Sequence, residues 1–84
     1  MRTTILLRLT PLFRDVLNDQ TLVITESSTA ETMPNYDSLA HIDVISAIEK
    51  ELGVQFDFVE LVPLRSVGDM ITLVARKLGA TEAA

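Results

Sequence analysis

The sequence predicts an all-α protein: a small four-helix bundle of three principal helices and one short helix, with a long first loop. Apolar residues recur at three- and four-residue steps in three separate segments, which is the spacing of one face of an α-helix. No segment alternates convincingly between polar and apolar residues, so a sheet is not expected. The 84 residues suffice for one small core but not for two. We therefore expect a single domain over 1–84, ordered at about 5–78, with a frayed tail at 80–84.

The first predicted helix covers about Ile5–Leu17, with Thr3 or Thr4 as candidate caps. Its apolar positions at helical spacing are Ile5, Leu9, Phe13 and Val16. Pro11 lies inside this segment, and an interior proline removes a backbone donor at a cost of about 3 kcal/mol. Either the helix kinks at Pro11, or the main helix starts at Thr10 and Pro11 as cap and first position. The residues leave both possibilities open.

A stretch of about twenty residues, from Asn18 to Asp37, has no sustained period and is predicted to be a loop. Loops of this length inside compact domains are uncommon and usually functional. We expect Leu22, Val23 and Ile24 to hold its early part against the core.

The clearest predicted helix follows Asp37. Its apolar face consists of Val44, Ile45, Ile48 and Leu52. Asp37 or Ser38 is the candidate N-cap, because either side chain can accept a hydrogen bond from the free amides of the first turn. Gly53 supplies the stop.

Two further helices complete the prediction. After a linker whose Phe56 is expected to be buried, Asp57 caps a short helical turn through Phe58, Val59 and Leu61, before Pro63. Ser66 is the candidate cap of the last helix, which Gly79 closes. The apolar positions of that helix are Val67, Met70, Ile71, Val74 and Leu78.

Composition excludes several classes of function. The chain has no cysteine, which excludes disulfides, thiolate metal ligands and cysteine nucleophiles, so any thiol must come from outside. Its single histidine gives no case for a metal site. The apolar run after Met1 is broken by Arg8 and is too short for a signal peptide or a membrane span, so a cytoplasmic location is expected.

The net charge of −5 is concentrated in one third of the chain. Between Asp37 and Glu60 lie six of the twelve acids and a single base, Lys50. Such a charge disfavours nucleic acid and favours partners with basic surfaces, although a solvated helix face is the commoner explanation of acidic clusters.

The tripeptide Asp37-Ser38-Leu39 is the candidate chemical site. Ser38 at the start of a helix has a structural use as a cap and a chemical use as an exposed hydroxyl. A phosphate attached there would lie near unpaired amides and the positive end of the helix dipole. A catalytic triad of Ser38, His41 and Asp37 is a poor alternative, because an adjacent acid and a histidine three residues on do not align a base with its orienting group.

At these residues the sequence resembles the acyl carrier protein family, over about Ile5–Leu78. The family motif Asp-Ser-Leu matches Asp37-Ser38-Leu39 and opens a second helix, after a long loop and before a short third helix and an amphipathic fourth. The resemblance implies a non-enzymatic carrier. By this resemblance, Ser38 would bear 4′-phosphopantetheine, with Asp37 and Leu39 on either side of it. A separate Mg²⁺-dependent synthase would transfer the group from coenzyme A. The terminal thiol of that group would hold an acyl cargo.

Other residues follow from the same resemblance. The helix flank that meets partner enzymes would comprise Leu39, Ile42, Asp43 and Glu49. The candidate lining of an acyl pocket is Val44, Ile48, Phe56, Leu61 and Ile71. Asn35-Tyr36 stands where many members have glycine, and an aromatic residue there resembles carriers outside the standard fatty-acid type. Ala40 stands where fatty-acid carriers often have an acid, and Lys50 interrupts the acidic series, so a specialised set of partners is expected.

We expect a monomeric carrier, without nucleic-acid partners, that presents acyl intermediates of fatty-acid, polyketide or related biosynthesis to enzymes with basic docking surfaces. The phosphopantetheinyl transferase is its first partner. The alternative is a non-catalytic helical interaction module in which Ser38 is only a helix cap. A small esterase built on Ser38 and His41 lacks an oxyanion-hole signature.

Overall fold

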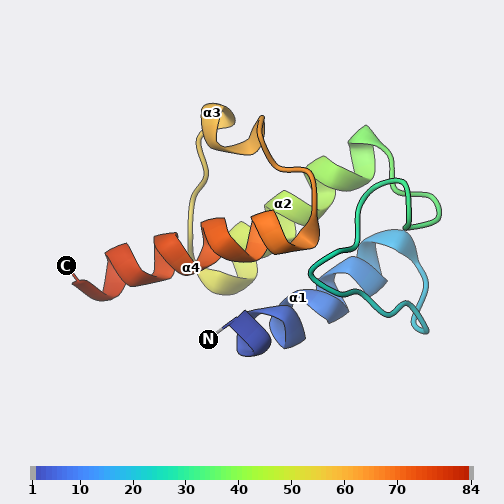
Figure 1. Cartoon of the computed structure of the whole chain (residues 1–84), viewed down its shortest axis with the longest axis horizontal. Coiled ribbons are helices and arrows are strands. Elements are labelled where there is room, and N and C mark those ends of the chain that lie inside the picture. Colours follow the sequence, from blue (N-terminus) through green and yellow to red (C-terminus); the bar gives the residue numbers. More distant parts are fainter. Residues whose placement is uncertain (1, 84) are drawn as a thin grey trace.

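The computed structural model describes the backbone of residues 2–83 and the side chains of residues 2–79. It contains four helices: α1 (Arg2–Leu17), α2 (Ser38–Leu52), α3 (Phe58–Leu61) and α4 (Val67–Ala83) (Figure 1). Within the described range there is no strand, only an isolated bridge between Thr29 and Ser66. The predicted all-α class, with three long helices, one short helix and a long first loop, is confirmed.

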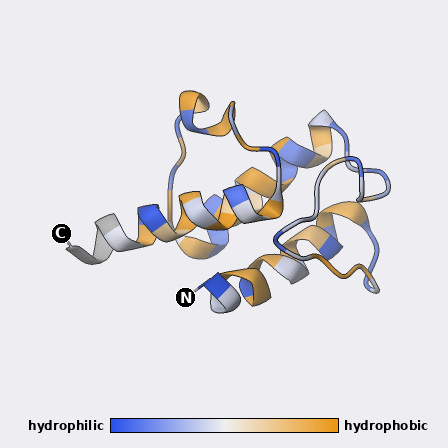
Figure 2. Cartoon of the chain, viewed as in Figure 1, coloured by the Kyte–Doolittle hydropathy of each residue, from blue (hydrophilic) through white to orange (hydrophobic). Residues whose placement is uncertain are grey.

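The core lies between α1, α2 and α4. α1 packs on both other long helices, whereas α3 stands at the edge of the molecule, away from α1 (Figure 1). Apolar bands recur along each long helix (Figure 2). The largest fully buried side chains are Phe13, Leu9, Ile48, Ile71, Val44, Val67 and Val74. The helical face predicted for each long helix is therefore the face that it buries.

α1 runs without interruption through Pro11 and begins at Arg2. The expectation that Thr3 or Thr4 caps the helix is wrong, and so is a main helix starting at Pro11. Leu9 and Phe13, on either side of the proline, are fully buried, and this packing outweighs the donor lost at Pro11.

The early start of α1 is explained by contacts of the Arg2 side chain. Its Nη2 donates to Glu26 Oε1 at 2.6 Å and to the Gly68 carbonyl at 3.0 Å, and its Nη1 donates to Thr72 Oγ1 at 2.8 Å. These bonds join the first turn of α1 to the long loop and to α4.

The long loop is attached to the core at a few points. Ile24 and Met33 are buried, and Leu22 is half-buried. Val23 is 74% exposed, so the expectation that it packs on the core is wrong. Its two neighbours, Leu22 and Ile24, take the half-buried and buried positions of this irregular segment.

Backbone bonds fasten the second half of the loop to the start of α4. Val67 N donates to Ser28 O at 2.9 Å, and Gly68 N donates to Glu26 O at 2.8 Å. Two otherwise unpaired amides of the first turn of α4 are thereby satisfied by the loop. This attachment holds the loop against the start of α4.

Side chains cap the starts of α2 and α4. Asp37, not Ser38, caps α2, and Gly53 ends it in a left-handed conformation with φ 67°. The Ser66 hydroxyl accepts from Asp69 N at 3.1 Å, as expected for the cap of α4. Gly79 does not close this helix, which continues to Ala83, because a glycine inside a helix weakens it by about 1 kcal/mol without ending it. Residue 84 lies outside the described range, and fraying of 80–84 stays a prediction.

The short helix α3 is held by contacts of the Glu60 side chain. Glu60 Oε1 accepts from Asp57 N at 2.9 Å and pairs with Lys77 Nζ of α4 at 2.7 Å. The hydrogen bond from Asp57 N, followed by the one from Lys77, lowers the pKa of Glu60. Phe58 and Val59 are exposed, whereas the preceding Phe56 is half-buried rather than fully buried.

Candidate functional site

Ser38 is the first residue of α2, and its side chain is exposed. Asp37 Oδ1 accepts from Ala40 N at 2.9 Å, and the Asp37 carbonyl accepts from His41 N at 2.9 Å. Within the described residues the Ser38 hydroxyl makes no hydrogen bond. Since Asp37 is the cap, the interpretation of Ser38 as only a helix cap is wrong, and its hydroxyl is available for chemistry.

The backbone around Ser38 suits an anion. The first-turn amides of Ser38 and Leu39 have no acceptor among residues 2–83, whereas the next two amides are taken by Asp37. Free amides and the positive end of the α2 dipole together favour negative charge at this helix start. A phosphodiester on Ser38 Oγ would lie close to these free amides and to the positive end of the dipole.

Tyr36 and His41 form a pair beside this site. The Tyr36 hydroxyl lies 2.7 Å from His41 Nδ1, and the Tyr36 ring stacks on Phe13 of α1 with centroids 5.9 Å apart. Burial lowers the pKa of His41 and raises the pKa of Tyr36 to about 12. Both side chains are therefore neutral near pH 7.

This pairing removes the basis for a Ser38–His41–Asp37 triad. His41 Nδ1 is engaged by Tyr36, and the Asp37 carboxylate is engaged by the amide of Ala40. Among residues 2–79 no acid is bonded to His41 to orient it, as nucleophilic catalysis would require.

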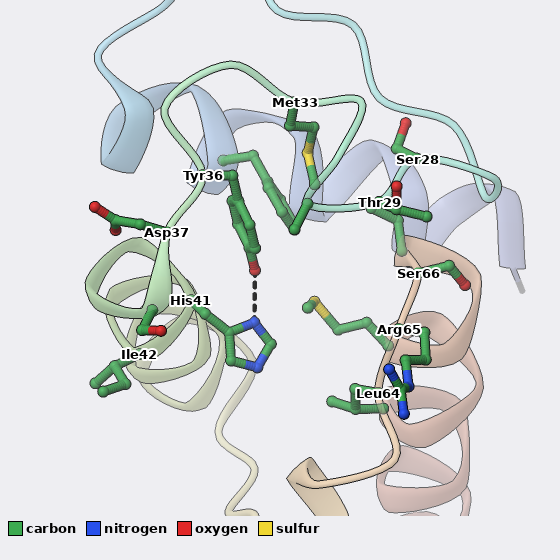
Figure 3. A pocket seen from close by; sticks show the side chains of 15 residues that line it. Ser28, Thr29, Met33, Tyr36, Asp37, His41, Ile42, Leu64, Arg65 and Ser66 are labelled. Atoms are coloured by element: carbon green, nitrogen blue, oxygen red, sulfur yellow. Dashed lines mark hydrogen bonds between the residues drawn. The ribbon is translucent and has the colours of Figure 1, made fainter.

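A cavity of about 450 Å³ opens next to Ser38 (Figure 3). It lies between the long loop, the start of α2 and the start of α4, with Met33, Tyr36 and His41 on one side and Leu64 and Arg65 on the other. The predictions from sequence did not include it. The aromatic Tyr36 before the motif and the lone His41 after it were the available signals.

Of the four residues predicted to meet partner enzymes, three share one exposed surface and Glu49 does not. Leu39 and Ile42 are 71% and 59% exposed, and Asp43 is exposed beside them. Glu49 lies farther along α2, is half-buried, and its Oε2 accepts from Phe56 N at 2.9 Å. The structure thus brings Leu39, Ile42 and Asp43 together near Ser38 and assigns Glu49 a structural contact.

The predicted acyl-pocket residues lie elsewhere in the core. Val44, Ile48 and Ile71 are fully buried, and Phe56 and Leu61 are half-buried against them. None of the five lines the cavity beside Ser38.

The comparisons with known proteins agree with this geometry. Residues 8–74, which include the whole of α2, match the family model described as the phosphopantetheine attachment site. The chain belongs to the acyl carrier protein family. It is 36% identical over 62 residues to an acyl carrier protein of Thermosynechococcus vestitus, covering 74% of this chain and 75% of that protein. It is also similar to the solution structure of a holo acyl carrier protein from Geobacter metallireducens, with 36% identity and a TM-score of 0.86, covering 93% of this chain and 90% of that one.

Family membership settles the class of function. The protein is a non-catalytic carrier with covalently attached 4′-phosphopantetheine, and it interacts with a phosphopantetheinyl transferase and with biosynthetic enzymes. When attached, the prosthetic group supplies a terminal thiol that carries the acyl cargo as a thioester, and the chain itself has no cysteine. No helix within residues 2–83 is both long and apolar enough to cross a membrane.

Proposed function

We propose that Ser38 is the residue that bears 4′-phosphopantetheine. In the transfer, Ser38 Oγ forms a bond to phosphorus, the diphosphate bond of coenzyme A breaks, adenosine 3′,5′-bisphosphate leaves, and the hydroxyl proton goes to a base of the transferase. The observation that carries this proposal is the exposed Ser38 hydroxyl at a helix start whose capping is done by Asp37. The free amides of Ser38 and Leu39 favour the phosphodiester that results.

The proposal is tested by intact mass after incubation with coenzyme A and a phosphopantetheinyl transferase. Ser38→Ala should gain no mass and should lose little stability, because Asp37 keeps the cap. Ser46→Ala, which removes an exposed hydroxyl from the same helix, is the matched control and should be modified like the native chain. Mass gain in Ser38→Ala would refute the assignment.

We infer that partner enzymes dock on Leu39, Ile42 and Asp43. Steps of three and four residues place these side chains on one face of α2, where two large apolar groups remain exposed next to an acid. The acidic excess between Asp37 and Glu60 favours a basic partner surface. Glu49 is left out of this surface, because its carboxylate is bonded to Phe56 N.

A saturated acyl chain is proposed to enter the interior between α2 and the α3 edge, lined by Val44, Ile48, Phe56, Leu61 and Ile71. All five side chains are apolar and make no hydrogen bonds that would resist separation. α3 buries none of its own residues, so it is the element that can move aside.

The pathway served by the carrier is proposed to be fatty-acid, polyketide or related biosynthesis in the cytoplasm, with the protein acting as a monomer. Tyr36, where many family members have glycine nearby, is built into the site through its contacts to Phe13 and His41, which supports a specialised carrier.

A further inference from the structure

The cavity beside Ser38 has a mixed interior. Apolar side chains supply much of its wall: Phe13, Met33, Val67 and Met70. The Ser28 hydroxyl accepts a hydrogen bond from the Thr25 amide at 2.9 Å, and the Ser66 hydroxyl accepts one from the Asp69 amide at 3.1 Å. Both oxygens are therefore already bonded to backbone amides. Besides Thr29, Asp37 and Ser38, the other polar side chains of the lining are the Tyr36–His41 pair and Arg65 (Figure 3).

The Tyr36–His41 pair presents a directed donor to the cavity. The Tyr36 hydroxyl has one described partner, His41 Nδ1, and the phenol proton is used within the described residues when the hydroxyl donates to that nitrogen. The neutral imidazole then carries its own proton on Nε2. Among the described residues no acceptor meets Nε2, so this N–H is offered to whatever enters the cavity.

Arg65 adds a second donor at the opposite wall. Its backbone amide bonds to Asp69 Oδ2 at 2.9 Å, but its guanidinium makes no ion pair or hydrogen bond within the described chain. In Figure 3 it lies across the cavity from the α2 residues His41 and Ile42. An oxygen in the cavity would therefore find donors on both sides.

From this arrangement we propose that the cavity binds the carrier's own acyl cargo when that cargo bears a hydroxyl or keto oxygen, with His41 Nε2–H donating to the oxygen. The proposal rests on attachment at Ser38, which lies on the cavity rim. A volume of about 450 Å³ is within the range of small-molecule sites, roughly 300–1,000 Å³. A saturated chain would fill the same space but leave the N–H without an acceptor, so it should bind there less well than an oxygenated chain.

The ligand oxygen could also come from the amides of the pantetheine arm, so the test compares four forms of the full chain. They are the arm alone, and the arm loaded with hexanoyl, 3-hydroxyhexanoyl or 3-oxohexanoyl groups. Intact mass first establishes that each group is attached, which separates failure of the attachment site from failure of the cavity proposal. The ring nitrogens of His41 and the amides of residues 28–38 and 64–67 are then followed by NMR.

The oxygenated cargoes should shift the His41 Nε2 signal and the lining amides, whereas the arm alone and hexanoyl should not. Tyr36→Phe keeps the aromatic ring stacked on Phe13 and removes only the hydroxyl, so this variant should load normally but lose the difference between cargoes. Ser46→Ala, away from the cavity, should keep the difference. Equal shifts with the arm alone, equal shifts with hexanoyl, no shifts, or a difference that survives Tyr36→Phe would each overturn the proposal.

Discussion

The Tyr36 hydroxyl lies 2.7 Å from Nδ1 of His41, and this bond joins the end of the long loop to the first turns of α2. Because the Tyr36 ring also stacks on Phe13, one side chain connects the loop, α1 and α2 within a few residues of Ser38. The position of the helix start that bears the proposed attachment site therefore depends on a loop residue.

The pair should make stability depend on pH. Burial lowers the pKa of His41 below its ordinary 6.5, so the unfolded chain binds this proton more tightly than the folded chain does. The contribution of neutral His41 is present above about pH 6.5 and is lost as the pH falls through the lower value of the folded state. Between about pH 7.5 and about pH 5.5, the free energy of unfolding measured by chemical denaturation should fall more for the native chain than for His41→Gln. Equal losses in both would contradict this role.

Gly68 should tolerate no side chain, because a Cβ there would lie 2.9 Å from the Glu26 carbonyl oxygen. Gly68→Ala must displace the loop from α4 and should lower the free energy of unfolding by about 1–3 kcal/mol. Gly79, inside the same helix, has open space around its Cβ position, so Gly79→Ala should be neutral or stabilise by up to about 1 kcal/mol. Thermal or urea unfolding of the two variants checks both expected changes in stability. A Gly68→Ala variant as stable as the native chain would show that the loop is not held against α4 as described.

Asp43 and Glu49, both acids of α2, should behave differently on substitution. Asp43→Lys should slow transfer of the prosthetic group, mostly at low salt, because exposed charges are screened beyond about 8 Å at physiological ionic strength. Glu49→Ala removes the acceptor of Phe56 N and should cost about 1 kcal/mol of stability. Asp15→Lys makes the same charge reversal on α1 and should leave the transfer rate closer to native. If Asp43→Lys and Asp15→Lys slow transfer equally, net charge rather than a docking face is responsible.

A long saturated cargo should be found in the interior rather than beside Tyr36. Loading should raise the melting temperature relative to the unloaded carrier, because the folded state binds the chain preferentially. Amide shifts should concentrate in residues 42–62, around Val44 and Ile48 and at the α3 edge. Shifts confined to Ser38 and its neighbours, without a gain in melting temperature, would indicate a cargo left in solvent.

The spacing of apolar residues was sufficient to predict the three long helices, since each predicted apolar face is buried. It failed where tertiary contacts decide: Arg2 extends α1 through bonds to Glu26 and Gly68, and Pro11 is accommodated between two buried residues. Neither effect is local, so neither can be derived from spacing within α1.

The candidate site was predictable in part. The motif at Ser38 follows from sequence, because a helix start needs few other residues to define it. Three features could not be predicted: the choice of Asp37 as the cap, the bond of Glu49 to Phe56 N and the cavity at Tyr36. They depend on side-chain directions and on the path of a twenty-residue loop, and the spacing of apolar residues carries no information about either.

The most direct test of the central claim locates the modification on the native chain. After enzymatic transfer from coenzyme A, trypsin should release the peptide Asp15–Lys50, which has no internal lysine or arginine and holds Ser27, Ser28, Ser38 and Ser46. Fragmentation of this peptide by mass spectrometry should place the whole mass of phosphopantetheine on Ser38. Its appearance on any of the other three serines, or on a threonine of the loop, would contradict the claim that the start of α2 is the attachment site.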